Sequence, residues 1–383
     1  MPTYPTYKLG DVAEIILGQS PESKFYNTKG EGLPFFQGKT EFTDWFPIPN
    51  KWCTEPKKIA EPFDVLLSVR APVGPTNIAK EKCCIGRGLA AIRYADCYKY
   101  VLYYLRSVSK YLESKATGTT FSSISGDTIK DLPIPLPPLS TQHAIVTRIE
   151  TLFAELDKAV QHLRTAQQQL KIYRQAVLNH WLNNEEGKWE MVKLGEVAEM
   201  CLGKMLDKSK NKGTYQPYLR NVNVRWGSFD LDDLLEMRFE ESEQERYGIQ
   251  IGDLIMCEGG EPGRCAIWNA TVPNMKIQKA LHRIRVKDSI YNKFVYYLFS
   301  LYAQNGRLEK FFTGTTIKHL TGQSLKSIEI PLPPLAEQQR IVAEIESRLS
   351  QAEAAAASIE NALQQAEALR QSILKKAFSG ELV

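Results

Sequence analysis

The sequence predicts a mixed α/β protein, α+β in arrangement, made of two similar globular domains and two long helices. Three observations predict this fold class. They are an internal repeat that covers the chain, short strand and helix patterns within each copy, and one long helical pattern after each copy. The predicted boundaries are 1–139 and 188–335 for the globular domains, and 140–187 and 336–383 for the helical regions.

The repeat is visible as ordered matches between the two halves of the chain. Residues 8–14 (KLGDVAE) return as 193–199 (KLGEVAE), and residues 134–139 (IPLPPL) return unchanged as 330–335. The offset between copies grows inside the globular part and stays constant through the helical part, which places the insertions in surface loops. The remaining matches pair 34–37 with 217–220, 63–67 with 252–256, 85–89 with 277–281, and 117–120 with 313–316.

Each globular copy has the short patterns of a mixed α/β domain. Apolar and β-branched runs broken by Gly and Pro are typical of strands, whereas runs with aromatic residues at helical spacing predict short helices with a buried aromatic face. The predicted strands are 64–69, 90–94, 254–257 and 282–286, and the predicted short helices are 100–105 and 294–301.

A long helix is predicted after each Pro-Leu-Pro-Pro-Leu run, because residues 141–186 and 336–379 contain neither Pro nor Gly. Apolar residues recur every three or four positions in both segments, which is the pattern of a coiled-coil seam. The first seam is rich in leucine and the second in alanine, so we expect the two helices to pair antiparallel around a pseudo-twofold axis. About 44 helical residues would span roughly 65 Å. Dimerisation of the protein through these helices is the alternative.

The charge distribution permits nucleic-acid binding by the globular parts. The net charge is +4, and residues 1–139 carry 17 Lys+Arg against 14 Asp+Glu, whereas residues 188–335 carry 21 against 18. A positive excess of this size is compatible with phosphate binding, although a solvated mixed surface explains it equally well.

The sequence lacks the motifs of a stand-alone enzyme. It has no phosphate-binding Gly-x-x-x-x-Gly-Lys-Ser/Thr run, no nucleophile elbow and no His-Glu-x-x-His. Seven cysteines occur without a Cys-x-x-Cys pair, and the five histidines lack metal-ligand spacing, so we expect no catalytic residue, metal or cofactor in this chain. No signal peptide or membrane span is recognisable, and we therefore expect a cytoplasmic protein.

Several of these motifs together resemble the specificity subunit of type I restriction–modification systems. They are 63–70 (FDVLLSVR), 117–120 (TGTT), the duplicated IPLPPL, 337–341 (EQQRI) and the ending 377–383 (AFSGELV). The resemblance implies a non-catalytic phage-defence subunit whose two target-recognition domains bind a bipartite, asymmetric sequence in double-stranded DNA. It also implies two modification subunits that dock on the helices and methylate adenine with S-adenosylmethionine, and restriction subunits that use ATP and Mg²⁺.

Three alternatives remain from the sequence. They are a subunit of a methyltransferase-only or related phage-defence complex, a coiled-coil scaffold without DNA binding, and a nuclease with an unrecognised site.

The residues that would read DNA follow from side-chain chemistry alone. Arg and Lys suit guanine edges and phosphates, whereas Asn and Gln suit adenine. A solvated surface side chain is the alternative at each position, and a lysine cluster at 204, 208, 210 and 212 is expected to meet phosphate if it meets DNA. The candidates are Gln37, Lys39, Arg70 and Arg87 in the first copy, and Arg220, Asn221, Asn223, Arg225, Lys276 and Lys279 in the second.

Overall fold

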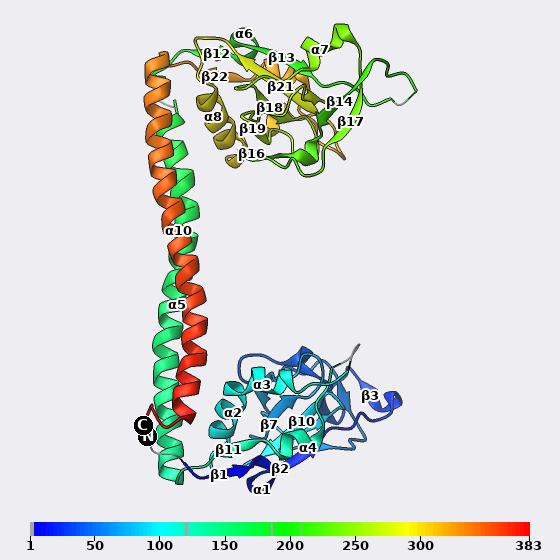
Figure 1. Cartoon of the computed structure of the whole chain (residues 1–383), viewed down its shortest axis with the longest axis vertical. Helices are drawn as coiled ribbons and strands as arrows, with labels where there is room; N and C mark the ends of the chain where they lie inside the picture. Colours follow the sequence, from blue (N-terminus) through cyan, green and yellow to red (C-terminus); the bar gives the residue numbers. More distant parts are fainter. Residues whose placement is uncertain (1–3, 119–121, 185–186, 208) are drawn as a thin grey trace. The chain divides into compact units, whose positions relative to one another are not determined.

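Two mixed α/β domains and two long helices make up the protein. The computed structural model describes residues 4–118, 122–184, 187–207 and 209–383. Contacts divide the chain into two compact units, Met1–Arg164 with Glu360–Val383 and Thr165–Ile359. Each unit holds one globular domain together with parts of α5 (Leu139–Leu182) and α10 (Leu335–Phe378) (Figure 1).

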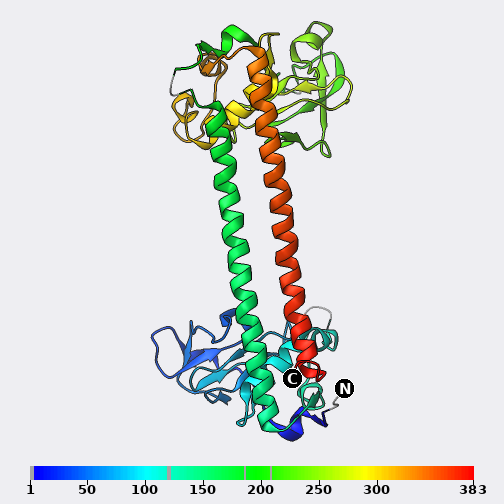
Figure 2. The same ribbon diagram turned by 90° about the vertical axis from the view of Figure 1, so that its left-hand side faces the viewer.

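The two long helices pair antiparallel, as the seam pattern predicts. In the first unit, the start of α5 (Ile145, Ile149) shares one buried cluster with the end of α10 (Ile373, Leu374). In the second unit, the end of α5 shares a cluster with the start of α10, and the paired segments lie side by side in both views (Figures 1 and 2). Two helices can bury only one face each, so part of the expected seam stays exposed: Ala159, Tyr173, Ala355 and Leu369.

The first domain is built on two sheets. One is antiparallel with strand order β2-β10-β7-β8, and the other is mixed with order β3-β5-β4-β9-β6, while β1 pairs with β11. Its strands are β1 (Thr6–Lys8), β2 (Glu14–Leu17), β3 (Tyr26–Asn27), β4 (Leu33–Phe36), β5 (Trp52–Cys53), β6 (Ile59–Ala60), β7 (Val65–Ser68), β8 (Thr76–Ile78), β9 (Cys83–Ile85), β10 (Leu89–Arg93) and β11 (Pro133–Pro135). Its helices are α1 (Leu9–Val12), η1 (Ser23–Phe25), η2 (Lys39–Glu41), α2 (Tyr98–Ser107), α3 (Ser109–Ser114) and α4 (Gly126–Lys130).

The second domain repeats this topology. Its antiparallel sheet has the order β13-β21-β18-β19, its mixed sheet has the order β17-β14-β20, β12 pairs with β22, and β15 pairs with β16. Its strands are β12 (Met191–Lys193), β13 (Ala198–Leu202), β14 (Thr214–Leu219), β15 (Val224–Arg225), β16 (Ser228–Phe229), β17 (Leu235–Phe239), β18 (Leu254–Cys257), β19 (Cys265–Ile267), β20 (Lys276–Ile277), β21 (Leu281–Val286) and β22 (Glu329–Pro331). Its helices are α6 (Leu194–Val197), η3 (Asn221–Asn223), η4 (Glu241–Glu243), α7 (Gln244–Tyr247), α8 (Asn292–Gln304), η5 (Glu309–Phe311) and α9 (Gly322–Lys326).

The register of the strands confirms the alignment of the two copies. Phe36 lies opposite Ile85 in the parallel pair β4–β9, and their sequence counterparts Leu219 and Ile277 lie opposite each other in β14–β20. The short helices α2 and α8 also bury their aromatic residues, as predicted, with Tyr100 donating its hydroxyl proton to the carbonyl of Pro135 at 2.7 Å. The duplication is therefore structural as well as sequential.

A buried ion pair anchors the central strand in each domain. Asp64, just before β7, accepts two hydrogen bonds from Arg93 at 3.0 and 2.9 Å, and Asp253 accepts two from Arg285 at 2.8 and 2.7 Å. Both aspartates are 2% exposed, and these bonds raise the pKa of both arginines. The pair joins the start of β7 to the end of β10, and the start of β18 to the end of β21. This contact holds the two strands in register, so the loops at their opposite ends start from fixed positions.

An ion pair also attaches each domain to the helix that follows it. Lys99 of α2 pairs with Glu150 of α5 at 2.7 Å, and Lys293 of α8 pairs with Glu346 of α10 at 2.7 Å. Both pairs are half-exposed, so they contribute orientation more than stability. Each domain therefore meets its helix through the same contact.

Candidate nucleic-acid interface

Five loops of the first domain meet at one edge, which we call the first rim: residues 18–20, 37–39, 69–71, 86–88, and 117–118 with 122–124. Backbone hydrogen bonds link each loop to the next across the edge, so the main chain, rather than the side chains, fixes the relative positions of the loops. The bonds run from Gln19 N to Ile85 O (3.0 Å), Gly88 N to Gln37 O (3.2 Å), Val69 N to Gly88 O (2.9 Å) and Ile124 N to Val69 O (3.1 Å).

The second domain has the same construction, which we call the second rim: residues 203–205, 220–223, 258–260, 278–280 and 313–320. Its bonds fall at the positions that correspond to those of the first rim or next to them. They run from Lys204 N to Ile277 O (3.1 Å), Gln278 N to Leu219 O (3.1 Å), Glu258 N to Ala280 O (2.8 Å) and Leu320 N to Glu258 O (2.8 Å).

The structure places all four first-domain candidates on the first rim. Gln37 directly follows β4, Lys39 opens η2, Arg70 follows β7 and Arg87 follows β9. All four side chains are exposed, and within the described part of the chain none of the three cations has a carboxylate partner. Arg87 is held through its backbone, whose N–H donates to the Ser20 hydroxyl at 3.2 Å. These side chains are therefore free to meet an external anion or base.

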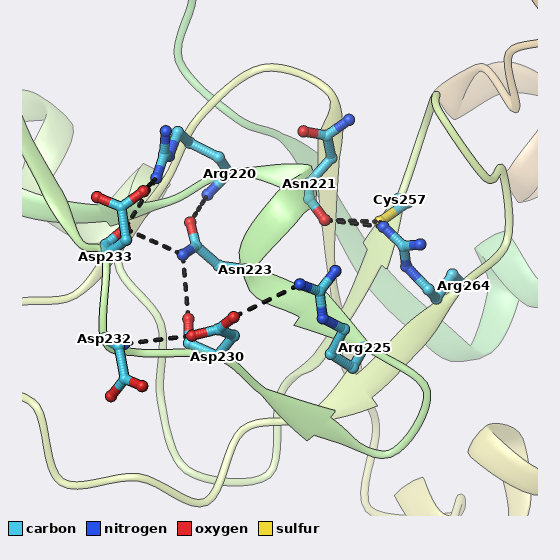
Figure 3. A network of polar contacts seen from close by, with 9 residues as sticks. All are labelled: Arg220, Asn221, Asn223, Arg225, Asp230, Asp232, Asp233, Cys257 and Arg264. Carbon is cyan, nitrogen blue, oxygen red and sulfur yellow. Dashed lines mark hydrogen bonds and ion pairs between the residues drawn. The ribbon is translucent and has the colours of Figure 1, made fainter. Parts of the chain in front are cut away.

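Two second-domain candidates form ion pairs with an acidic stretch that follows them (Figure 3). Arg220 Nη2 donates to Asp233 Oδ2 at 2.7 Å and to the Asp233 carbonyl oxygen at 2.8 Å. Arg225 Nη2 lies 3.4 Å from Asp230 Oδ2, at a more exposed position. Lys279 is exposed on the same rim, at the position that corresponds to Arg87.

The Asn221–Asn223 turn is held by hydrogen bonds on both sides (Figure 3). Asn223 is 2% exposed, accepts from Arg220 N at 2.9 Å, and donates to the carbonyls of Asp230 and Asp233 at 3.0 and 3.2 Å. The carbonyl of Asn221 accepts from Arg264 Nη2 at 2.9 Å. The Asn223 amide is thus occupied within the protein, where it fixes the shape of the turn.

One candidate lysine and one member of the lysine cluster are buried. Lys276 is 4% exposed in β20, and burial lowers the pKa of its ammonium group. Lys204 donates to Glu243 at 2.5 Å and to the Arg238 carbonyl at 3.0 Å, so its charge is neutralised inside the domain. Lys210 lies 3.7 Å from Asp207, Lys212 is exposed, and Lys208 lies outside the described residues, as do Thr119 and Thr120 of the TGTT motif.

Sequence reasoning missed the residues that hold the candidate side chains in place. Arg264, Asp233 and Ser20 act through Asn221, Arg220 and Arg87 respectively. Only the Gly-rich run around Arg264 carries a signal, because clustered glycines indicate a tight turn, and Gly260 and Gly263 do have positive φ values of 79° and 94°. Asp233 lies in an acidic stretch that is indistinguishable from a solvated surface in the sequence.

The described residues show neither a metal-ligand cluster nor, at Cys83 and Cys84, a readily ionised thiol. Among them, no group of three or more His, Cys, Asp or Glu side chains is arranged to hold a metal ion. Burial raises the pKa of the Cys83 and Cys84 thiols to about 12, which keeps both protonated at neutral pH. None of the described helices has the length and apolar character needed to cross a membrane.

A family model described as "Type I restriction modification DNA specificity domain" matches residues 1–163 and 186–367. The chain belongs to this family. It is the DNA target-recognition specificity subunit of a type I restriction–modification system, a non-catalytic subunit, as the sequence motifs predict.

Curated relatives agree with this assignment. The chain is 39% identical over 170 residues to the putative MjaX specificity subunit of Methanocaldococcus jannaschii, covering 43% of this chain and 39% of that protein. It is 26% identical over 375 residues to the EcoKI specificity subunit of Escherichia coli strain K12, covering 90% and 80%.

Two solved structures show the fold. One is a chain from a structure that concerns complex assembly and conformational transition of the type I R-M system. Its TM-score is 0.77 at 20% identity, and the match covers 100% of this chain and 99% of that chain. The HsdS subunit from Thermoanaerobacter tengcongensis has a TM-score of 0.68 at 20% identity, with coverage of 100% and 98%.

Proposed function

We propose that each domain reads one half of a bipartite, asymmetric DNA sequence through its rim, and that the paired helices set the gap between the halves. One observation carries this proposal: the two rims share a backbone framework but differ in side chains at matching positions. Gln37 corresponds to Arg220, and Arg87 corresponds to Lys279. An amide suits adenine and a guanidinium suits guanine, so equal frameworks would read unequal half-sites.

The exposed rim side chains are the best candidates for base or phosphate contact. In the first domain they are Gln37, Lys39, Arg70 and Arg87, and in the second Lys279. The half-buried Arg220 and Asn221, and the exposed Arg225 just beyond the second rim, are further candidates. The buried Asn223 and Lys276 would support the rim from beneath. The recognition domains would span 1–139 and 188–335, with 140–187 and 336–383 as helical regions.

The helices and their junctions with the domains would dock two modification subunits. Each unit has a groove where the domain meets both helices, of about 660 Å³ in the first and 480 Å³ in the second. The grooves have matching linings, with Tyr103 and Arg370 in the first and Tyr297 and Arg174 in the second. Two equivalent surfaces suit two copies of one partner.

The chemistry would belong to those partners, in the cytoplasm. Modification subunits would methylate adenine with S-adenosylmethionine, and restriction subunits would use ATP and Mg²⁺ to translocate and cleave unmodified DNA. This chain would bind none of these cofactors itself.

Footprinting of the full chain on DNA tests the proposal. We expect two short protected patches with an unprotected gap between them, and an affinity that falls steeply as salt rises because phosphate contacts release counterions. One contiguous protected patch would overturn the bipartite reading. Incubation of the same preparation with DNA and Mg²⁺ should give no cleavage, which separates this proposal from a nuclease.

A further inference from the structure

Three cations on or beside the second rim form ion pairs with carboxylates, whereas the described cations of the first rim do not. We call residues 230–243 the acidic segment; its acidic members are Asp230, Asp232, Asp233, Glu236, Glu240, Glu241 and Glu243. Arg220, Arg225 and Lys204 each pair with one of these side chains. In the described part of the first domain, Lys39, Arg70 and Arg87 have no such partner. The acidic segment is therefore a feature of the second domain that the first domain lacks at its rim.

The pair between Arg220 and Asp233 controls which donors of Arg220 face outward. Nη2 gives both of its hydrogen bonds to Asp233, one to the carboxylate at 2.7 Å and one to the carbonyl at 2.8 Å. Nε is buried and has no hydrogen-bond partner among the described residues. A bidentate contact with guanine needs two adjacent nitrogens, and each such pair in a guanidinium includes Nη2. While the ion pair is closed, only Nη1 remains for DNA.

The carboxylate can leave without moving the loop that carries it. The Asp233 side chain is 76% exposed, whereas that of Arg220 is 23% exposed. The backbone on either side is anchored separately, because Asn223 Nδ2 donates to the carbonyls of Asp230 and Asp233. Opening the pair therefore requires only a rotation of the Asp233 side chain and of the Arg220 guanidinium.

We infer that Asp233 is a specificity-determining residue that offers Arg220 an internal partner in competition with guanine. This inference rests on the proposed function of the second rim. When guanine is present, Arg220 exchanges the carboxylate for the base edge. When another base is present, Arg220 stays with Asp233, and no unpaired charge is left in the interface. Asp233 thus lowers DNA affinity and makes one base pair of the second half-site tolerant of substitution.

Selection from a randomised duplex library, with the full chain as bait, tests this inference. Asp233→Asn removes the carboxylate charge at nearly constant shape, and Asp232→Asn removes the same charge one residue away, where the side chain has no contact with Arg220. In Asp233→Asn we expect stronger enrichment of guanine at one position of the second half-site and an affinity for that sequence about fivefold higher. The first half-site and the Asp232→Asn variant should match the wild type.

Two results would overturn the inference while leaving the proposed function intact. One is identical enrichment in Asp233→Asn and Asp232→Asn. The other is weaker guanine enrichment in Asp233→Asn, because Asp233 would then orient Arg220 for DNA rather than compete with it. Asp233→Glu, which restores the carboxylate, should return the enrichment toward the wild type. If the wild-type chain enriches no two-part sequence, the proposed function fails as well.

Discussion

The two recognition domains share one framework but differ in how their rims are charged. Val69 N donates to Gly88 O in the first domain, and at the corresponding positions of the second domain Glu258 N donates to Ala280 O. On this common frame, Arg87 stands without a carboxylate partner among the described residues, whereas Arg220 is closed onto Asp233. Backbone and buried ion pairs therefore set the shape, and loop side chains can change the chemistry without disturbing it.

The largest expected effect comes from the buried ion pair that both domains share. Asp64→Asn should destabilise the first domain and Asp253→Asn the second, each by about 3 kcal/mol, because each removes the buried carboxylate that pairs with an arginine. Hydrogen exchange of β7 and β18 would measure each domain separately. Glu14→Gln, which removes the exposed partner of Arg93 at 2.8 Å, is the control and should change stability by less than about 0.5 kcal/mol. Unequal losses in the two domains would contradict a shared framework.

The next effect concerns DNA and separates the rims. Arg87→Ala should weaken binding by about 2 kcal/mol and relax recognition at one base pair, because a guanidinium can hold guanine with two hydrogen bonds. Lys279→Ala at the corresponding position should weaken binding less, because an ammonium group acts as a point charge. Equilibrium binding to the selected duplex measures both. Lys80→Ala is the control, because Lys80 follows β8 and is not part of the first rim, and it should leave DNA affinity unchanged. A loss of affinity in Lys80→Ala equal to that in Arg87→Ala would contradict the assignment of Arg87.

A smaller effect of opposite sign is expected at two positions, Gly88 and Ala280, that match in sequence but differ in backbone conformation. Ala280 has a φ of 85°, which is strained for any residue with a Cβ, so Ala280→Gly should stabilise the second domain by about 1 kcal/mol. A Cβ at Gly88 would lie 2.4 Å from the Gln37 carbonyl oxygen, so Gly88→Ala should destabilise the first domain by about the same amount. Thermal unfolding measures both, and shifts of the same sign would refute this account of the turn.

The smallest effect is a pH dependence confined to the second domain. His282 is buried in β21 where the first domain has Ala90, and burial lowers the pKa of the imidazole. As pH falls, the imidazole of the unfolded chain is protonated before that of the folded chain. The free energy of unfolding is therefore highest above the ordinary histidine pKa of about 6.5 and decreases as pH falls below it. Hydrogen exchange at several pH values should show this loss in β21 beyond any change in β10. Equal losses in both strands would exclude His282 as the cause.

The sequence predicted the features that depend on local pattern and on the repeat. Proline-free helical segments, the antiparallel pairing and the aligned strands all follow from spacing within a few residues. The pairing of Arg220 with Asp233 did not follow, because it depends on how the loop after β16 folds back onto η3. The burial of Lys276 did not follow either, since a lysine in a strand of only two residues resembles a loop residue in the sequence, and the mixed sheet that buries it is formed by segments distant along the chain.

Exchange of one recognition domain tests the central claim most directly. Residues 1–139 would be replaced by the corresponding domain of a family member with a different target, and methylated adenines would then be mapped across the host genome. The account predicts that one half of the recognised sequence changes while the other half and the gap stay the same. A change in both halves, or in neither, would contradict it.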